Sequence, residues 1–245
     1  EATKFAQYLL DADKAYTATL KLGEASSTGD AEGEIIATAR ADISLAEFQT
    51  ACQALTGNIR QVPPMFSALK HEGKPLYEYA RKGIVIERKP RDITIYAIDI
   101  TEFDAPKAFI DVRCSKGTYI RTLSEDIAKH IGTFAHLTAL RRTETAGFTI
   151  RESYTLDALA ELNETDRDAL LLPCDVLVRH LPKIELNDRA VTMLKCGQRP
   201  QFTEDMSAEQ PIRVYDRSGT FIGLVEYQNE IVRLKALRLM NTAKD

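Results

Sequence analysis

The sequence predicts an α+β protein in which a mixed or largely antiparallel sheet carries helices on its faces and a small β-rich domain follows. Three observations lead to this fold class. Runs in which apolar and polar residues alternate, typical of half-buried strands, recur between residues 16 and 114. Stretches with helical spacing and capping signals separate these runs. Three closely spaced strand patterns end the chain, after a change of composition near residue 182.

The first predicted elements lie before residue 57. Apolar residues alternate along 16–22, which predicts a strand, and a loop rich in Gly and Ser follows over 23–33. Ser44 and Glu47 have the spacing of a capping box, and apolar residues at helical spacing continue from there to Gly57. We therefore expect a strand, a loop and a helix in this order.

The middle of the chain predicts two further strands and a helix. Residues 93–100 and 108–114 alternate and are rich in β-branched side chains. A turn over 115–118 then leads into a helix whose inner face carries Ile120, Leu123 and Ile127.

An acidic, helical segment is expected over 152–182, with seven acidic and two basic residues. Its buried stripe is predicted to consist of Leu156, Leu159 and Leu162.

The last part of the chain predicts a small domain. Asn187 is expected to cap a short helix that ends at Gly197. Strands are predicted over 212–215, 220–227 and 231–239. These elements predict one domain over 1–182 and a second, β-rich domain over 183–245.

The composition is that of a soluble globular protein, with 44% hydrophobic and 28% charged residues among 245. No apolar run approaches the roughly 20 residues that a membrane helix needs, so we expect no membrane association. Four widely spaced cysteines without a CxxC motif are expected to be thiols of a reducing compartment, which favours a cytoplasmic protein.

The net charge of −4 conceals two basic segments. Residues 60–91 carry +5 and residues 112–142 carry +4, which leaves −13 on the remainder. If the two segments meet in space, they would form a footprint for a polyanion. Phe66, Tyr77 and Tyr79 lie among the basic residues of the first segment, as RNA with unstacked bases would require. A solvated helix with inward-facing aromatic rings explains the same composition, so both interpretations stay open.

The motifs of common enzyme classes are missing. The sequence has no GxSxG, P-loop, HExxH or GxGxxG motif in its structural context, and its four histidines are scattered. A hydrolase or a metalloenzyme therefore receives little support.

Five local patterns, in this order, resemble one family. They are EATKF at 1–5, the stretch 13–23 that begins DKAY, the block 63–83 that begins PPMFSALK, SKGTYIR at 115–121, and HLTALRR at 136–142. The chain resembles the bacterial tRNA pseudouridine synthases of the TruB type over essentially its whole length. These enzymes isomerise the T-loop uridine at position 55, without cofactor or metal, by flipping it out of the loop and breaking and re-forming its glycosidic bond.

The resemblance implies a set of site residues. Tyr16 matches the position that lies against the flipped uracil and is the candidate general base. Tyr119 and Leu140 match the other uridine-pocket positions. Arg121 matches an arginine that pairs with the catalytic aspartate, and Asp30 is similar to the second carboxylate of its network. From the residues alone, a core tyrosine, a helix-surface arginine and a turn-forming aspartate explain Tyr16, Arg121 and Asp30 instead.

The resemblance also implies a tRNA partner, bound through its T arm. Residues 61–91 resemble the family's RNA-gripping insertion, and 183–245 correspond in position to its PUA domain, which contacts the acceptor end. The RNA-binding candidates are basic residues of the two positive segments: Lys70, Lys74, Arg81, Lys82, Arg141 and Arg142.

One family feature is missing from the sequence. The nucleophile of the family is an aspartate in a GALDPLATG stretch just upstream of the position that corresponds to Glu1, and the 245 residues contain no copy of it. We therefore expect an amino-terminally truncated chain that is inactive by itself. We also expect the protein to be a monomer. The alternatives are a non-catalytic RNA-binding module or tRNA-folding chaperone, and a structural or protein-interaction domain without salt-dependent affinity for tRNA.

Overall fold

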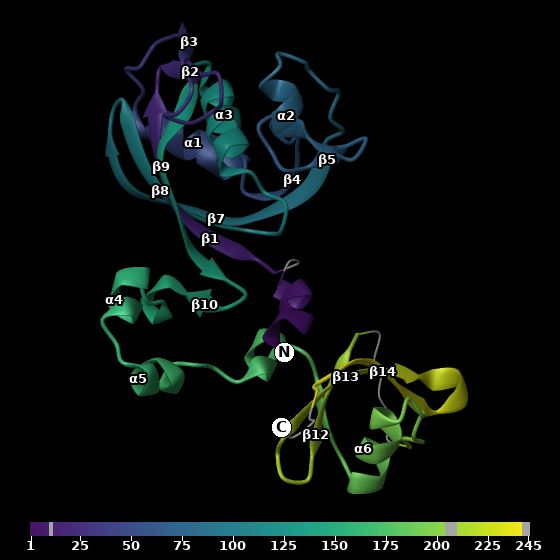
Figure 1. The fold of residues 1–245 in the computed structure, drawn as a ribbon. Helices are drawn as coiled ribbons and strands as arrows, with labels where there is room; N and C mark the ends of the chain where they lie inside the picture. Colours follow the sequence, from purple (N-terminus) through teal and green to yellow (C-terminus); the bar gives the residue numbers. More distant parts are fainter. Residues whose placement is uncertain (10–11, 204–209, 242–245) are drawn as a thin grey trace. The chain divides into compact units, whose positions relative to one another are not determined.

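The computed structural model describes residues 1–9, 12–203 and 210–241 and forms two compact units (Figure 1). The central unit comprises Asp11–Ser153, and the second unit comprises Glu1–Leu10 together with Tyr154–Asp245. The predicted domain boundary near residue 182 falls within the second unit, directly before its sheet, and stays a prediction.

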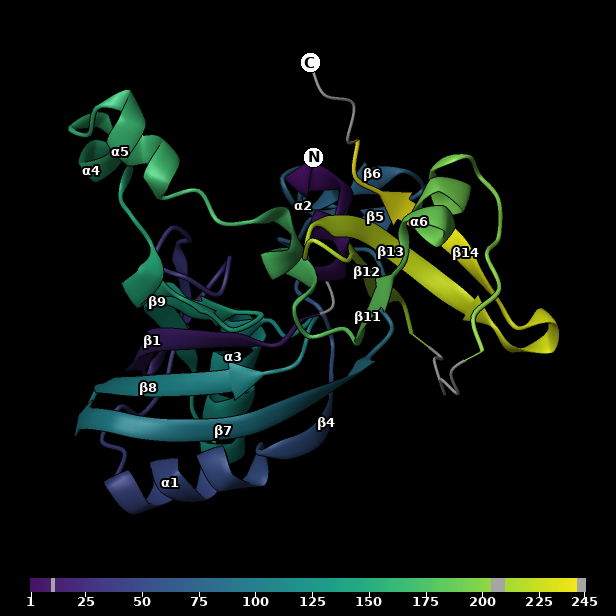
Figure 2. The ribbon, with the colours of Figure 1, turned by 90° about the horizontal axis from the view of Figure 1, so that it is seen from below.

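The central unit is built on a six-stranded antiparallel sheet of order β10-β9-β1-β8-β7-β4 (Figure 2). The strands are β1 (Lys14–Leu22), β4 (Gly57–Gln61), β7 (Arg91–Asp104), β8 (Lys107–Cys114), β9 (Ala135–Thr145) and β10 (Phe148–Thr149). Two small hairpins join β2 (Glu24–Ser26) to β3 (Ile35–Thr38) and β5 (Lys70–His71) to β6 (Lys74–Pro75). The predicted antiparallel character of this sheet is confirmed.

One face of the central sheet holds the core, and helices α1 (Leu45–Ala54) and α3 (Ile120–Ile131) cover it (Figure 1). Leu20 of β1, Ile110 of β8 and Leu123 of α3 are fully buried there. Burying one such side chain stabilises the fold by about 1.5–3 kcal/mol. The alternation along 16–22 thus predicted the correct buried face, because one side of β1 faces the two helices.

Helix α1 begins, and helix α3 ends, where local signals place them. The Ser44 hydroxyl accepts a hydrogen bond from the Glu47 backbone N–H, and the Glu47 carboxylate accepts one from the Ser44 backbone N–H, which completes the predicted capping box of α1. Helix α3 ends at Gly132, whose φ of 80° is the left-handed conformation that glycine adopts without strain.

The second unit contains a four-stranded sheet of order β11-β12-β13-β14 (Figure 2). Its strands are β11 (Lys183–Leu186), β12 (Ile212–Asp216), β13 (Phe221–Gln228) and β14 (Arg233–Leu239). Helix α6 (Asp188–Lys195) begins after Asn187, whose side chain accepts a hydrogen bond from the Ala190 N–H as expected. The three predicted strands are confirmed, whereas β11, which pairs parallel to β12, has too few alternating residues to be predicted.

The first residues of the chain belong to this second unit. Two short 3₁₀ helices, η1 (Ala2–Lys4) and η2 (Ala6–Leu9), flank Phe5, which is fully buried. The Phe5 ring packs edge-on against Phe221 with 5.2 Å between the ring centroids.

The predicted buried stripe in 152–182 is wrong. This segment forms the short elements η3 (Ile150–Glu152), α4 (Leu156–Ala160), α5 (Glu164–Ala169) and η4 (Cys174–Val178). Leu156 is 84% exposed, and Leu159 and Leu162 are only half-buried. Helix α4 already ends at Ala160 and α5 begins only after its N-cap Asn163, so Leu162 lies between the two helices and the predicted leucines do not share one continuous helical face.

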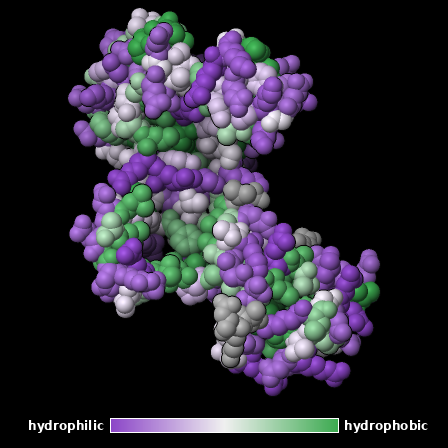
Figure 3. Space-filling model, viewed as in Figure 1, coloured by the Kyte–Doolittle hydropathy of each residue, from purple (hydrophilic) through white to green (hydrophobic). Residues whose placement is uncertain are grey.

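Apolar side chains are consequently exposed along this segment. Leu171 and Leu172 lie in the connection after α5 and are exposed like Leu156. Figure 3 shows hydrophobic side chains gathered around the α4–α5 segment. Within the described ranges, no helix is long and apolar enough to cross a membrane.

Candidate functional site

Arg121 lies in the first turn of α3 and forms an ion pair with Asp30. In the described part of the chain, this is the one ion pair between predicted catalytic residues. The arginine's Nη1 donates to Asp30 Oδ2 at 3.0 Å and to the Thr28 carbonyl at 3.2 Å, and its Nη2 donates to the Phe66 carbonyl at 2.6 Å. The two charged side chains are 24% and 29% exposed, so solvent screens this pair less than a fully exposed one. The guanidinium therefore joins three segments that are far apart in the sequence.

Asp30 serves the turn and the ion pair at once. Its Oδ1 accepts hydrogen bonds from the Thr28 hydroxyl at 2.5 Å and from the Glu32 N–H at 3.3 Å, while Oδ2 faces Arg121. The interpretation of Asp30 as a turn-forming residue is thus correct for its Oδ1. The turn fixes the carboxylate and leaves its other oxygen for the arginine.

Gly29 allows this turn to approach α3 closely. Its φ is +77°, and a Cβ at this position would lie 2.8 Å from Glu125 Oε1 and 3.5 Å from the Arg121 Cβ. A larger residue would be strained at this positive φ and would displace the Glu125 carboxylate.

Tyr16 lies on β1 opposite Val112 of β8 and Arg142 of β9, and its ring is half-buried against the core. Burial and the neighbouring Cys114 raise the pKa of the Tyr16 phenol above its usual value, while Arg142 acts in the opposite direction. The phenol is therefore protonated at neutral pH. In the described ranges its hydroxyl has no hydrogen-bond partner.

Leu140 lies on the same face of the sheet as Tyr16. It is opposite Ala18, two positions from Tyr16 along β1, and it is 47% exposed. An exposed leucine beside a half-buried ring provides the apolar wall and the flat surface that a nucleobase requires.

Tyr119 directly precedes α3, which packs on the same sheet face as Tyr16. Its side chain is half-buried, and its backbone is bound by the side chain of Gln61, the last residue of β4. The Tyr119 N–H donates to Gln61 Oε1 at 2.8 Å, and Gln61 Nε2 donates to the Tyr119 carbonyl at 3.2 Å. Gln61 was not predicted as a site residue, because its only local signal is a polar residue shortly before two prolines.

The insertion over 61–91 folds into the β5–β6 hairpin and helix α2 (Leu76–Ala80). Leu76 is buried, as the solvated-helix interpretation expects, but Tyr77 lies under the Arg81 guanidinium at 5.2 Å from its ring centroid. The region of α2 and β5 has a mainly hydrophilic surface (Figure 3).

The predicted RNA-binding residues are all exposed and all lie in the central unit. Lys70 and Lys74 lie on the hairpin, Arg81 and Lys82 follow α2, and Arg141 and Arg142 lie on β9. Arg142 pairs with Tyr16 across the sheet and Arg141 with Thr17, which puts the second basic segment next to the candidate base.

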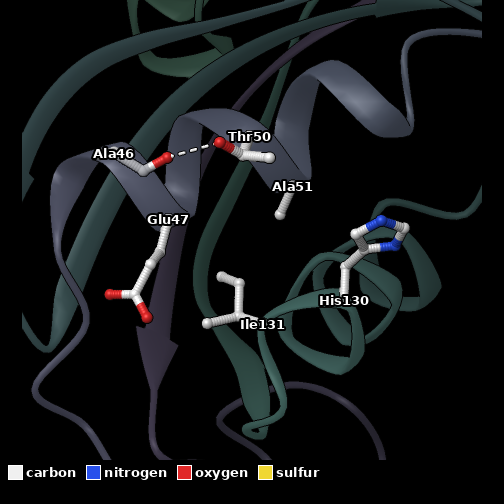
Figure 4. Close-up of a pocket in the computed structure, with 6 residues that line it drawn as sticks. All are labelled: Ala46, Glu47, Thr50, Ala51, His130 and Ile131. Carbon is white, nitrogen blue, oxygen red and sulfur yellow. Dashed lines mark hydrogen bonds between the residues drawn. The ribbon is translucent and has the colours of Figure 1, made fainter.

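A pocket of about 390 Å³ between α1 and α3 lies away from these residues (Figure 4). Its lining residues are Ala46, Glu47, Thr50, Ala51, His130 and Ile131. His130 is nine residues beyond Arg121 on α3, about 14 Å along the helix at its usual rise. The pocket therefore belongs to the opposite end of α3 and is not part of the candidate site. No group of His, Cys, Asp and Glu suited to a metal occurs among the described residues.

Three protein-family models match consecutive parts of the chain. Residues 1–120 match the TruB family pseudouridylate synthase (N terminal domain), and 121–179 match the tRNA pseudouridylate synthase B C-terminal domain. Residues 182–240 match pseudouridine synthase II TruB, C-terminal.

Curated relatives and solved structures agree with these matches. The chain is 85% identical to tRNA pseudouridine synthase B of Neisseria meningitidis serogroup B over 243 residues, covering 99% of this chain and 79% of that protein. It is 48% identical to the Chromobacterium violaceum protein of the same name, covering 98% and 78%. A chain in the crystal structure of a Cbf5-Nop10-Gar1 complex has the same fold, with a TM-score of 0.71, 21% identity, and coverage of 97% of this chain and 69% of that one.

Proposed function

The chain belongs to the TruB family of pseudouridine synthases, and from this premise we propose that the protein isomerises uridine 55 in the T loop of tRNA to pseudouridine. The observation that carries the proposal is the Arg121–Asp30 pair at the start of α3, in the central unit that also holds Tyr16, Tyr119 and Leu140. An arginine fixed in this way at a half-buried site is suited to holding a reacting carboxylate ionised.

Arg121 has donors left for such a carboxylate. A guanidinium carries five N–H groups, and the hydrogen bonds to Thr28, Asp30 and Phe66 use three of them among the described residues. The remaining two can bind a second carboxylate in the forked geometry that arginine prefers. This second carboxylate is the nucleophile in the proposed mechanism.

The pocket receives the flipped base. Tyr16 presents a ring and a free hydroxyl, Tyr119 a second ring, and Leu140 an apolar wall. The base must leave the stack of the T loop, because its reacting atoms are shielded there. Since the Tyr16 phenol is protonated at neutral pH, its role as general base requires it first to give its own proton to solvent, after which the phenolate oxygen takes up the proton from C5 of the base.

The basic residues of the insertion and of β9 are proposed to bind the T arm. Lys70, Lys74, Arg81, Lys82, Arg141 and Arg142 are exposed and provide charge for phosphates without reading the sequence. Residues 183–245 are proposed to act as a PUA-like RNA-binding domain after a catalytic domain over 1–182. The proposed protein is a cytoplasmic monomer that uses neither cofactor nor metal.

None of the aspartates among the 245 residues lies in the sequence context of the family's nucleophile. We therefore expect these 245 residues to bind tRNA without turnover.

Release of tritium from tRNA labelled at uridine C5 tests the proposal in the natural protein. We expect release by the wild type, and loss of release with retained tRNA binding in Tyr16→Phe and Arg121→Ala. Binding without release in the wild type would contradict the proposed activity and favour an RNA-binding module or a tRNA-folding chaperone. An affinity for tRNA that does not change with salt would instead favour a structural domain.

A further inference from the structure

Gln61 is the one nearly fully buried side-chain amide among the described residues, and it is bound to a site residue. It is 2% exposed, and its two hydrogen bonds go to the backbone N–H and carbonyl of Tyr119, 58 residues away. A side-chain amide that binds both groups of one residue fixes the backbone orientation of that residue. The direction in which the Tyr119 ring leaves the backbone is therefore set from β4.

The backbone at Tyr119 has few other constraints. Tyr119 is the N-cap of α3 and makes no side-chain cap hydrogen bond, with φ −105° and ψ 111°. Its carbonyl accepts the Leu123 N–H at 3.0 Å, but its own N–H is at the helix start, where intrahelical partners are lacking. Gln61 supplies the missing acceptor.

A second tether lies five residues further along the chain. The Phe66 carbonyl accepts a hydrogen bond from Arg121 Nη2 at 2.6 Å. The segment 61–66 is thus tied at its start to Tyr119 and at its end to Arg121. Pro63 and Pro64 stiffen the backbone between the two tethers, and Pro63 is buried.

The residues that follow the two ends of this second tether in the sequence are both buried. They are Ser67, after Phe66, and Thr122, after Arg121, and among the described residues their hydroxyls have no hydrogen-bond partner.

We propose that Gln61 is a positioning residue, which holds Tyr119 in place for the flipped uridine and ties the pocket to the segment that leads into the basic β5–β6 hairpin. This inference rests on the proposed function. It assigns Gln61 an effect on turnover, through Tyr119, and no contact of its own with the base.

The test uses the natural protein and two variants of similar size. Gln61→Met removes both hydrogen bonds, whereas Gln61→Glu keeps the acceptor for the Tyr119 N–H and loses the donor to its carbonyl. We expect kcat for tritium release to fall about 10- to 100-fold in Gln61→Met and less in Gln61→Glu, because a small misplacement of a pocket residue is costly. The dissociation constant for tRNA should stay within about threefold of the wild type.

Asn58→Ala is the matched control. Asn58 lies on the same strand and accepts a hydrogen bond from the Thr94 hydroxyl at 2.7 Å, so the variant loses a β4 hydrogen bond that does not involve Tyr119. We expect its kcat to equal that of the wild type. A loss in Asn58→Ala as large as that in Gln61→Met would overturn the proposal, because any damage to β4 would then suffice.

A double-mutant cycle shows whether Gln61 acts through Tyr119. If it does, Gln61→Met has little further effect on kcat in a Tyr119→Ala background, because the ring to be positioned is gone. Additive losses would overturn the proposal. Hydrogen exchange at the Tyr119 amide gives a readout that does not depend on activity: it should speed up in Gln61→Met and stay unchanged in Asn58→Ala. Faster exchange with an inactive wild type would contradict the proposed function while confirming the tether, whereas unchanged exchange in Gln61→Met would overturn the positioning role itself.

Discussion

Arg121 combines the proposed catalytic task and a structural task in one side chain. It holds Asp30 by an ion pair and the Thr28 and Phe66 carbonyls by hydrogen bonds, with the partners arranged around a planar guanidinium. A lysine ammonium has the same charge but cannot present parallel donors in one plane. The residue is therefore expected to be sensitive even to a substitution that keeps the charge.

Arg121→Lys should lower kcat for tritium release by about 100-fold or more, because loss of preorganised donors at a reacting charge typically has effects of this size. The affinity for tRNA should change little, since the positive charge remains. Single-turnover release and filter binding measure the two quantities. The assigned role would be wrong if Arg121→Lys turned over tRNA as fast as the wild type.

Glu47 lies outside the candidate site and leads to a prediction of how the stability of the protein depends on pH. Hydrogen bonds from Arg40 and Ser44 lower the pKa of this carboxyl from 4.5 to about 2 in the folded protein. A folded-state pKa below the unfolded value adds stability that is complete above about pH 4.5 and is lost as the pH falls toward about 2.

Glu47→Gln should therefore be less stable than the wild type at pH 6, and the difference should shrink on acidification. Urea unfolding of both proteins at pH 6, 4 and 2.5 checks this. If the difference in the free energy of unfolding stayed constant down to pH 2.5, the ionised Glu47 carboxylate would not be the source of the stabilisation.

Helix α3 is the element that organises the site. Its first turn carries Arg121, the preceding residue is Tyr119, and its apolar face anchors it through Leu123 and Ile127 to the sheet core. The amphipathic pattern fixes how the helix is rotated, so the core packing also directs the arginine toward the 28–30 turn. The end of the helix at Gly132 then sets its length.

Gly132→Ala tests this helix end. A Cβ at Gly132 meets no other atom within 4 Å, so the substitution introduces the strain of a left-handed backbone and no steric overlap. We expect a loss of about 1 kcal/mol in the free energy of unfolding, with a smaller loss for Gly132→Asn, since asparagine tolerates this conformation better. Urea unfolding measures both, and Lys129→Ala, an exposed change in the last turn of α3, serves as control. Equal stability of Gly132→Ala and the wild type would contradict the helix end described here.

The elements that sequence analysis predicted correctly are those with local signals. Strand β1 was visible from its alternation, and α1 from the Ser44–Glu47 spacing. The leucine pattern at 156–162 failed because α4 ends at Ala160 and leaves Leu162 outside the helix. Apolar spacing alone did not predict how short this helix is.

The contacts of the candidate site lie beyond such local signals. Asp30 and Arg121 are 91 residues apart, and their pairing was anticipated only through family resemblance. Gln61 and Tyr119 are 58 residues apart, and nothing in their neighbourhoods indicates that they meet. Both contacts depend on the strand order that brings β4, the 26–33 turn and the start of α3 to one place.

At the scale of the whole molecule, charge is distributed unevenly along the chain. The two basic segments, with +9 together, both lie in the central unit, while the remaining residues carry −13. Binding to a polyanion depends on the charge near the contact, since charges beyond about 10 Å are screened at ordinary ionic strength. The protein should therefore bind tRNA with the salt dependence of a basic protein, although its net charge is −4.

Two charge-matched double variants separate local from net charge. Lys70→Ala/Lys74→Ala removes two positive charges from the β5–β6 hairpin, and Glu161→Gln/Glu164→Gln removes two negative charges from an acidic stretch of the second unit. In a plot of log affinity for tRNA against log salt concentration, the first variant should reduce the slope by up to about two, because each phosphate contact contributes about one. The second should leave the slope unchanged while altering the net charge by the same amount. If the second variant increased the slope by as much as the first reduced it, net charge would govern binding, and the hairpin could not be the surface that grips the T arm.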